Sequence, residues 1–323
     1  MTQKKKNVQI SLTGGLGNQL FQFAAGLKLA EKRKLCLVTT LGAPRTSSFE
    51  KAELLSFVLP EQVEVLNNKQ ANWIIRKTAG FMLRKGVAPT FLEGHKLFAL
   101  ISGLLANLVM SFYFREKIVV ATSSGVGYSP IRITKSNTLL LGYYQSYRWA
   151  EDIDVKNKLD SITYASESKI LNKYVQDSKS ELPLIVHVRL GDYLLEKNFG
   201  TLSKSYYKNG ILQILKTGKC NSIWLFSDEI EKAWTYIPDE ILVPVRIIPE
   251  VEGSSAATLE AMRLGAGYVI ANSTFSWWAA FLRRNKEAEV IAPKPWFSGM
   301  PEPLDLIPAH WQRIDAGFSS NYH

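Results

Sequence analysis

Three clusters of polar side chains could bind an anionic ligand, and each cluster ends an apolar run of the sequence. They are His187-Val188-Arg189-Leu190-Gly191-Asp192-Tyr193, Phe226-Ser227-Asp228-Glu229 and Ala271-Asn272-Ser273-Thr274-Phe275-Ser276-Trp277-Trp278. An arginine such as Arg189 can bridge two phosphate oxygens and keeps its charge. Hydroxyl and backbone N–H groups at Ser273 and Thr274 would add donors to the same anion. Asp228 could accept hydrogen bonds from a ribose or a guanine, and the flat ring of Phe275 could contact a base. Together the clusters predict a pocket for a nucleoside diphosphate.

Each of these residues also has a structural interpretation. His187 could be a core histidine, Arg189 could form an ion pair with Asp192, and residues 272–274 could be an ordinary helix start. Trp277 and its neighbour are more typical of packing than of recognition. The coincidence of three polar clusters, each at the end of an apolar run, favours the binding site over these alternatives.

A fourth candidate is the glycine-rich segment Gly14-Gly15-Leu16-Gly17-Asn18-Gln19-Leu20-Phe21-Gln22. It lies between a predicted strand over Val8–Leu12 and a predicted helix over Gln19–Lys34, an arrangement that presents backbone N–H groups to an anion. The dinucleotide-binding pattern requires a third glycine where Leu20 stands, and an acidic residue near the end of the next strand, which is missing. A nucleotide-dependent oxidoreductase is therefore disfavoured. The side-chain amides of Asn18 and Gln19 remain as candidate ligand-binding groups at the turn. The alternative that stays open is that Asn18 only caps the helix.

The elements that must position these clusters alternate along the chain. From residue 184 onward, apolar strand-like runs alternate with helical patterns, which is typical of a doubly wound α/β domain. Ligands of such domains bind beyond the carboxyl ends of the strands, where the three clusters stand. We predict an N-terminal, acceptor-side domain over 1–150 and a connecting helical segment over 151–182. A donor-binding domain is expected over 183–300, followed by a non-regular tail over 301–323 that can fold back.

The composition fits a globular protein of two domains, with 323 residues of which 46% are hydrophobic. The two cysteines, Cys36 and Cys220, form no metal-type cluster, and the polar start of the chain predicts no signal peptide. Both features predict a cytoplasmic protein. The formal net charge of +10 suits an anionic donor or a membrane surface, and no nucleic-acid motif accompanies it.

The segment Leu97–Phe114 is uncharged and close to the length of a bilayer span. Its internal Ser102, Asn107 and Ser111 argue against insertion. Cations flank it on both sides, so we expect a buried or interfacial helix that contacts the inner face of the membrane peripherally.

Metal use is not expected. Asp152-Ile153-Asp154 has the D-x-D spacing that sugar-nucleotide enzymes use for Mg²⁺ or Mn²⁺. It stands at a predicted helix start, where acidic residues are favoured by the helix dipole, and we prefer that interpretation.

Four segments together resemble glycosyltransferase family 11, whose members are α-1,2-fucosyltransferases. They are the glycine-rich segment 14–22, Gly142-Tyr143-Tyr144-Gln145-Ser146, the cluster 187–193 and the segment Ile270–Trp278, in the order of the family and over most of the chain. The resemblance implies a GT-B-like pair of Rossmann-type domains facing a central cleft. It also implies an inverting, metal-independent transfer of L-fucose from GDP-fucose to a glycan hydroxyl. We expect this transfer to serve surface polysaccharide synthesis, and a lipid-linked acceptor would suit a helix over Leu97–Phe114 at the membrane.

The resemblance also implies roles for individual residues. His187, Arg189 and Asp192 fall on the family's donor motif as catalytic residues, with Arg189 at the donor diphosphate. By the resemblance, Gly17, Asn18, Asn272, Ser273, Thr274, Phe275 and Ser276 are expected to bind the donor. From their places beside these segments and at the second strand end, Gln19, Ser227, Asp228 and Glu229 are further donor-binding candidates, and Tyr144 and Gln145 are acceptor-side candidates. A general base is left open among Asp192, Asp228 and Glu229.

Two positions depart from the family pattern. Where the donor motif of the family has its second arginine, this chain has Leu190. Where the family has an acidic residue at the start of the helix before the last motif, this chain has Thr258. Both departures leave open the transfer of another deoxyhexose or of L-galactose. A non-catalytic sugar- or membrane-binding protein is the alternative from a different class.

Overall fold

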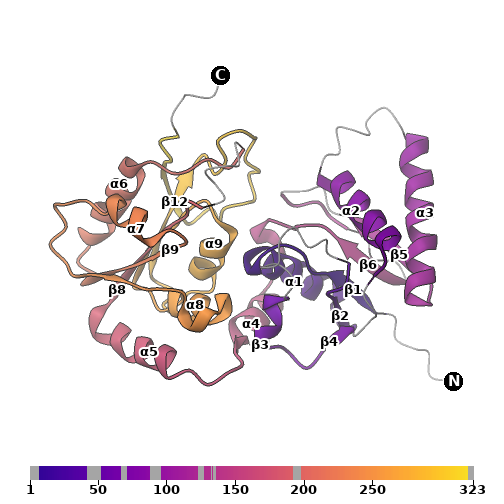
Figure 1. The fold of residues 1–323 in the computed structure, drawn as a ribbon, viewed down its shortest axis with the longest axis horizontal. Coiled ribbons are helices and arrows are strands. Elements are labelled where there is room, and N and C mark those ends of the chain that lie inside the picture. Colours follow the sequence, from indigo (N-terminus) through magenta and orange to yellow (C-terminus); the bar gives the residue numbers. More distant parts are fainter. Residues whose placement is uncertain are drawn as a thin grey trace. The chain divides into compact units, whose positions relative to one another are not determined.

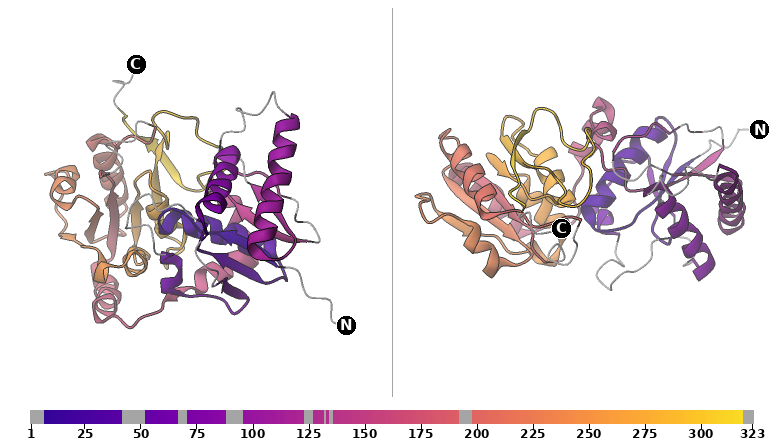
Figure 2. Two further views of the ribbon diagram at one scale, coloured as in Figure 1. Left: turned by 45° about the vertical axis from the view of Figure 1, so that its right-hand side comes forward. Right: turned by 90° about the horizontal axis from the view of Figure 1, so that it is seen from above.

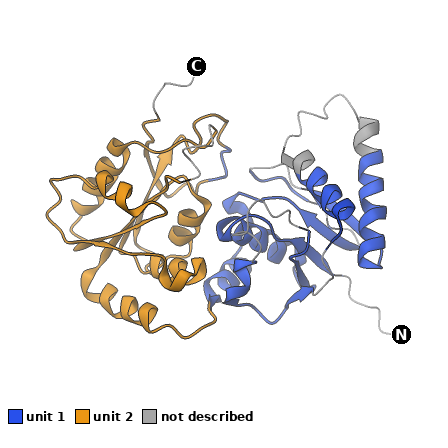
Figure 3. Cartoon of the chain, viewed as in Figure 1, with its two compact units in different colours: residues 1–163, 303–306 blue, residues 164–302, 307–323 orange. Residues whose placement is uncertain are grey.

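The computed structural model describes residues 7–41, 52–66, 71–87, 96–122, 127–131, 133, 136–191 and 198–318, and the chain forms two compact units (Figure 3). Unit 1 contains residues 1–163 and 303–306, and unit 2 contains residues 164–302 and 307–323. The chain therefore passes into the second unit after Thr163, and its tail contributes to both units.

Unit 1 is built on a parallel sheet of five strands in the order β4-β2-β1-β6-β5 (Figure 1). The strands are β1 (Val8–Ser11), β2 (Leu35–Val38), β4 (Val63–Leu66), β5 (Ile118–Thr122) and β6 (Asn137–Leu141). In register, Val8 of the central strand lies opposite Leu35 on one side and Thr138 on the other. Strands β1 and β2 are buried along their whole length. The burial explains the continuous apolar character of β2, whereas β1 also buries the polar Gln9 and Ser11.

Three helices cover this sheet: α1 (Leu16–Ala30), α2 (Trp73–Val87) and α3 (Lys96–Phe114). Ile75 of α2 and Met110 of α3 join Val38 in one buried cluster. Helix α1 lies on the other face, because Gly26 approaches Leu35, and residues three positions apart in a strand face opposite sides. Shorter elements complete the unit: the 3₁₀ turns Glu53–Ser56 and Tyr147–Trp149, helix α4 (Ile153–Ser161), and strand β3 (Phe57–Val58) paired with β7 (Thr163–Tyr164).

Unit 2 has a parallel sheet of six strands in the order β10-β9-β8-β11-β12-β13 (Figure 1). The strands are β8 (Pro183–Val188), β9 (Ser222–Ser227), β10 (Val245–Ile247), β11 (Gly267–Val269), β12 (Glu289–Lys294) and β13 (Gln312–Asp315). The helices are α5 (Lys169–Glu181), α6 (Lys204–Leu215), α7 (Ile230–Ala233), α8 (Ser255–Met262) and α9 (Thr274–Phe281), with 3₁₀ turns at Trp234–Tyr236 and Val251–Gly253.

The two faces of this sheet are also both covered by helices. Ile211 of α6 packs in one buried cluster with Leu184 and Leu225, while Trp224, on the other face, contacts Tyr174 of α5 at a ring distance of 5.5 Å. The predicted pair of doubly wound α/β units is thus confirmed (Figure 2). Trp277 and Trp278 are fully buried, so their role is packing.

The predicted connecting segment and tail differ from the observed elements. Residues 151–182 contain two helices, α4 in unit 1 and α5 in unit 2, separated by β7. The tail adds β13 to the edge of the unit 2 sheet, next to β12. Asp305 joins unit 1, where its carbonyl oxygen accepts hydrogen bonds from Tyr147 N at 3.1 Å and Ser146 Oγ at 3.0 Å.

Helix α3 confirms the helix expected over the uncharged segment. Across the parts of the chain that the structure describes, no helix has the length and hydropathy needed to cross a membrane.

Candidate functional site

The centre of the candidate site is Arg189, the first residue after β8. Its Nε lies 3.2 Å from Oδ2 of Asp228, which follows the neighbouring strand β9. The other carboxylate oxygen of Asp228 accepts a hydrogen bond from the backbone N–H of Leu190 at 3.0 Å. The arginine side chain is 32% exposed, so its guanidinium is oriented by a carboxylate and still reaches solvent. A cation fixed in this way is suited to bind an oxyanion.

This pairing gives Asp228 contacts that the sequence analysis did not predict. The sequence assigns it to a ribose or a guanine and considers Asp192 as the partner of Arg189. The structure instead uses both carboxylate oxygens of Asp228 to hold Arg189 and Leu190. Asp192 lies outside the described residues.

Gly191 is a residue that the sequence analysis did not single out. A Cβ atom at this position would lie 2.5 Å from Oδ2 of Asp228, closer than real contacts allow. Only glycine therefore lets the chain pass so near the carboxylate that orients Arg189. The signal for it was the glycine itself, two positions after a strand-end arginine.

His187 is buried just beneath this pair, with 5% of its surface exposed. Its ring centroid lies 6.2 Å from that of Phe275, and its carbonyl oxygen accepts a hydrogen bond from the Tyr207 hydroxyl at 3.1 Å. Burial, and next the positive charge of Arg189, lower the pKa of His187 to about 3, against the opposing effect of Asp228. The imidazole is therefore neutral at physiological pH.

The neutral state of His187 predicts a dependence of stability on pH. Its pKa is lowered from 6.5 to about 3 by folding, so below pH 6.5 the unfolded chain takes up a proton that the folded chain does not. The free energy of unfolding should thus decrease between pH 7 and pH 5, by roughly 2 kcal/mol from this group. Denaturant titrations at pH 7, 6 and 5 should show a shallower decrease for His187→Gln than for the wild type. Equal slopes would mean that His187 is not buried as a neutral group.

The start of helix α9 forms the other side of the site, after the neighbouring strand β11. The hydroxyl of Ser273 caps the helix by accepting a hydrogen bond from Phe275 N at 3.3 Å. Thr274 and Phe275 are half-buried, so they remain accessible beside the first backbone N–H groups of the helix. This end of α9 can therefore bind an anion next to Arg189.

Other predicted donor residues contribute to the local structure. The Asn272 Nδ2 donates hydrogen bonds to the carbonyl oxygens of Phe199 at 2.9 Å and Gly200 at 3.1 Å. The Ser276 hydroxyl is fully buried and donates to backbone carbonyls of the same turn.

The second cluster shows a similar use of its side chains. The hydroxyl of Ser227 accepts a hydrogen bond from Glu229 N at 3.0 Å, and Glu229 forms an exposed ion pair with Lys232 at 3.2 Å. These residues thus shape the loop after β9, next to Asp228.

The glycine-rich segment belongs to unit 1. Gly14 has a φ of +75°, and Gly15 is the N-cap of α1, so Asn18 lies within the first turn and is not the cap. The buried Gln19 donates to Gly14 O at 2.8 Å and accepts from Leu54 N at 3.0 Å, which uses both ends of its amide. Gly17 is buried in the same turn. Of this group, Asn18 is the residue with its side chain directed to another predicted site residue.

That residue is Gln145, one of the two acceptor-side candidates. Its Nε2 donates a hydrogen bond to Asn18 Oδ1 at 2.8 Å, which joins the two segments. The other candidate, Tyr144, is fully buried, has a φ of +55°, and packs edge-on against Trp149 at a ring distance of 5.7 Å. Burial also raises the pKa of Tyr144. The position thus supports the turn after β6, and its side chain does not reach the surface.

Comparison with known proteins identifies the chain at the level of the family. The model of a family described as "Glycosyl transferase family 11" matches residues 126–299, which include all three strand-end clusters. The chain belongs to glycosyl transferase family 11. It is 26% identical to an α-1,2-colitosyltransferase of Escherichia coli over 318 residues, which covers 94% of this chain and 97% of that protein.

Two further similarities accompany this family match. The O-antigen biosynthesis glycosyltransferase WbnK of Escherichia coli is 26% identical over 307 residues, covering 89% of this chain and 94% of the relative. Among solved structures, the family 9 glycosyl transferase from Veillonella parvula superposes with a TM-score of 0.48 at 10% identity, covering 98% of this chain and 88% of that one.

The two departures from the family 11 pattern have structural roles here. Leu190 is 3% exposed and lies in the main core of unit 2. Thr258 accepts a hydrogen bond from Val251 N at 2.8 Å and donates to Ser254 O at 2.9 Å, within α8 and the turn before it. Neither side chain carries the charge that the family pattern has at that place.

The D-x-D segment of this family 11 chain is a helix cap. Oδ1 of Asp152 accepts hydrogen bonds from Asp154 N at 3.1 Å and Val155 N at 3.4 Å at the start of α4. Within the described ranges, no group of three or more His, Cys, Asp or Glu side chains is placed to hold a metal ion.

Proposed function

We propose that this glycosyltransferase moves L-fucose from GDP-fucose to a glycan hydroxyl in an α-1,2 linkage, with inversion and without a metal ion. The observation that carries the proposal is the position of Arg189, which is oriented by Asp228 at 3.2 Å and follows β8, the neighbour of the strand β11 that precedes α9. Two sources of positive potential, a guanidinium and a helix N-terminus, then meet where a diphosphate would lie.

In this reaction the acceptor hydroxyl oxygen attacks the anomeric carbon from the face opposite the diphosphate. The bond between that carbon and the diphosphate oxygen breaks, GDP leaves with the electron pair, and the hydroxyl proton is released. Negative charge grows on the diphosphate as positive charge grows on the sugar. Arg189 and the backbone N–H group at Thr274, in the first turn of α9, stabilise the leaving group, while the neutral His187 adds no charge of its own.

The names of the relatives support the linkage and the biological setting. One relative is called an α-1,2-colitosyltransferase and the other an O-antigen biosynthesis glycosyltransferase. We therefore propose that the acceptor is a growing surface polysaccharide, lipid-linked and held at the cytoplasmic face of the membrane.

Colitose is the second candidate for the sugar, on the strength of the same relative's name. The loss of a charge at Leu190 and of an acid at Thr258 supports a donor that differs from the usual one of the family. Initial rates with GDP-fucose and with GDP-colitose, at the same acceptor and enzyme concentrations, give kcat/KM for each donor. The donor with the higher kcat/KM identifies the sugar.

The nucleotide is tested by thermal shift in buffer with EDTA. A ligand at a hundredfold excess over its Kd adds about 2.7 kcal/mol of stability, so at equal concentrations the nucleotide that binds most tightly gives the largest shift. We expect GDP to raise the melting temperature more than UDP or dTDP. Transfer from the sugar nucleotide should proceed in the same buffer. A larger shift with UDP or dTDP would overturn the choice of nucleotide. A requirement for Mn²⁺ in either measurement would overturn the metal-independent mechanism.

A further inference from the structure

Helices α2 and α3 of unit 1 lie side by side (Figure 2). Both expose large apolar side chains to solvent. On α3 the exposed side chains are Ile101, Leu104, Leu105, Leu108 and Phe112. Their spacing of three or four residues places them on one stripe of the helix. Leu108 is 68% exposed and Phe112 is 86% exposed, while Ala106 and Met110 on the opposite stripe are buried in the core.

Helix α2 extends this apolar face. Trp73, Ile74 and Phe81 are exposed, and the Lys77 ammonium lies 5.0 Å from the Trp73 ring centroid. The core-facing residues of the helix, including Ile75, lie on its other side. We call the exposed side chains of Trp73, Ile74, Phe81 and the five α3 residues the α2–α3 face. A group of exposed large apolar side chains on neighbouring helices often marks an interaction site.

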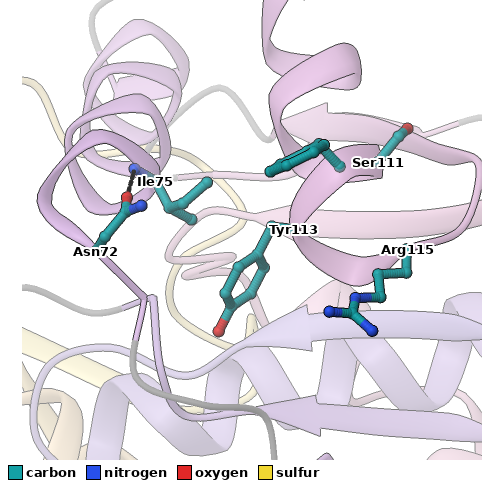
Figure 4. A pocket seen from close by; sticks show the side chains of 6 residues that line it. Asn72, Ile75, Ser111, Tyr113 and Arg115 are labelled. Carbon is teal, nitrogen blue, oxygen red and sulfur yellow. Dashed lines mark hydrogen bonds between the residues drawn. The ribbon is translucent and has the colours of Figure 1, made fainter.

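A pocket of about 550 Å³ opens at one end of the α2–α3 face (Figure 4). It is lined by Asn72 and Ile75 at the start of α2 and by Ser111, Phe112, Tyr113 and Arg115 at the end of α3. None of these residues belongs to the candidate active site. The pocket is predominantly apolar, and the cationic Arg115 stands at its edge.

The charges around the α2–α3 face favour an anionic partner. Helices α2 and α3 contain five Lys or Arg residues and no Asp or Glu. Arg115 and Lys117 follow α3, and Glu116 between them accepts hydrogen bonds from Gln9 and Asn137. Two copies of this positively charged face would repel each other, whereas an anionic lipid surface would attract the face. An apolar stripe with a tryptophan and flanking cations is also the pattern of interfacial helices.

We propose that the α2–α3 face docks on an anionic lipid bilayer, with the apolar side chains in the interface and Lys77 and Arg115 at the headgroups. The pocket beside Arg115 can receive an acyl chain beneath an anionic headgroup. This inference does not depend on the identity of the donor, because it concerns helices that carry no residue of the candidate active site.

The test is flotation of the full chain with phosphatidylcholine vesicles that contain or lack phosphatidylglycerol. The wild type should float with the anionic vesicles, and high salt should release it. The double variant Leu108→Glu/Phe112→Glu should bind at least tenfold more weakly, because both side chains are exposed and their replacement places charge in the interface. Lys77→Gln and Arg115→Gln should each weaken binding about fivefold.

Matched controls come from unit 2. Leu242→Glu changes a leucine that is 98% exposed and lies outside the face, and Lys216→Gln removes an exposed cation at the end of α6. Both should bind like the wild type, and transfer to a soluble acceptor should be unchanged in all variants. Equal flotation of the double variant and the wild type would overturn the proposal. So would a wild-type dimer, seen by light scattering, that the double variant abolishes.

Discussion

Replacement of Arg189 by alanine should lower kcat by 10²–10³-fold and leave the fold intact. The guanidinium is oriented by Asp228 at the end of β8, next to the strand that leads to α9, and the loss of one preorganised donor at a developing anion costs about 3–4 kcal/mol of transition-state stabilisation. Its ion pair with Asp228 is partly exposed to solvent, so its removal should change the stability little. Initial rates and thermal unfolding of the same preparation measure both effects.

Arg246→Ala is the matched control. Arg246 also pairs with carboxylates of unit 2, Asp177 at 2.8 Å and Glu181 at 3.1 Å, but it lies within β10 and away from the strand ends. This variant should retain wild-type kcat even if it is less stable. Arg189→Lys should recover only part of the activity, because an ammonium keeps the charge and loses the planar pair of donors. Wild-type turnover in Arg189→Ala would contradict the role of this residue at the diphosphate.

Replacement of Glu260 by alanine should destabilise unit 2 by about 3–5 kcal/mol. The Glu260 carboxylate is 2% exposed and pairs with Arg263 at 2.7 Å and Arg284 at 2.8 Å. Arg263 is itself buried and donates from Nε to Leu282 O at the end of α9. Removal of the carboxylate leaves a buried guanidinium without its counter-charge next to the helix that starts at the active site.

Chemical denaturation measures this loss. The control is Glu240→Ala, which removes a carboxylate from an exposed ion pair with Lys208 and should leave the unfolding midpoint nearly unchanged. A wild-type midpoint for Glu260→Ala would show that the buried pair contributes nothing net to stability.

The strand ends of the site could be predicted from sequence because parallel strands covered on both faces are apolar throughout. Apart from the buried His187 and Ser222, the polar residues of β8 and β9 begin where burial ends, at Arg189 and Ser227, so the change of character marks the site. The partner of Arg189 could not be predicted in the same way. It depends on the register of two strands: Val188 lies opposite Ser227, which places the next residues, Arg189 and Asp228, side by side.

Other differences have equally local causes. The side-chain oxygen of Gln19 accepts a hydrogen bond from the backbone N–H of Leu54, 35 positions later in the sequence. Leu54 lies in a 3₁₀ turn that no sequence pattern predicts. Strand β13 has the sequence Gln-Arg-Ile-Asp, and an edge strand with so many polar residues lacks the hydrophobic signal of a strand. Tyr144 takes a left-handed backbone conformation, which the sequence does not encode in a tyrosine.

The discontinuous course of the tail limits how this enzyme can be dissected and recombined. A fragment of residues 126–299, the part that matches the family model, begins within unit 1 and lacks the edge strand β13. Such a fragment does not correspond to a folding module. A chimaera that exchanges unit 2 between family members would have to transfer 164–302 and 307–323 together, while keeping 303–306 from the recipient, where Asp305 bonds to Ser146.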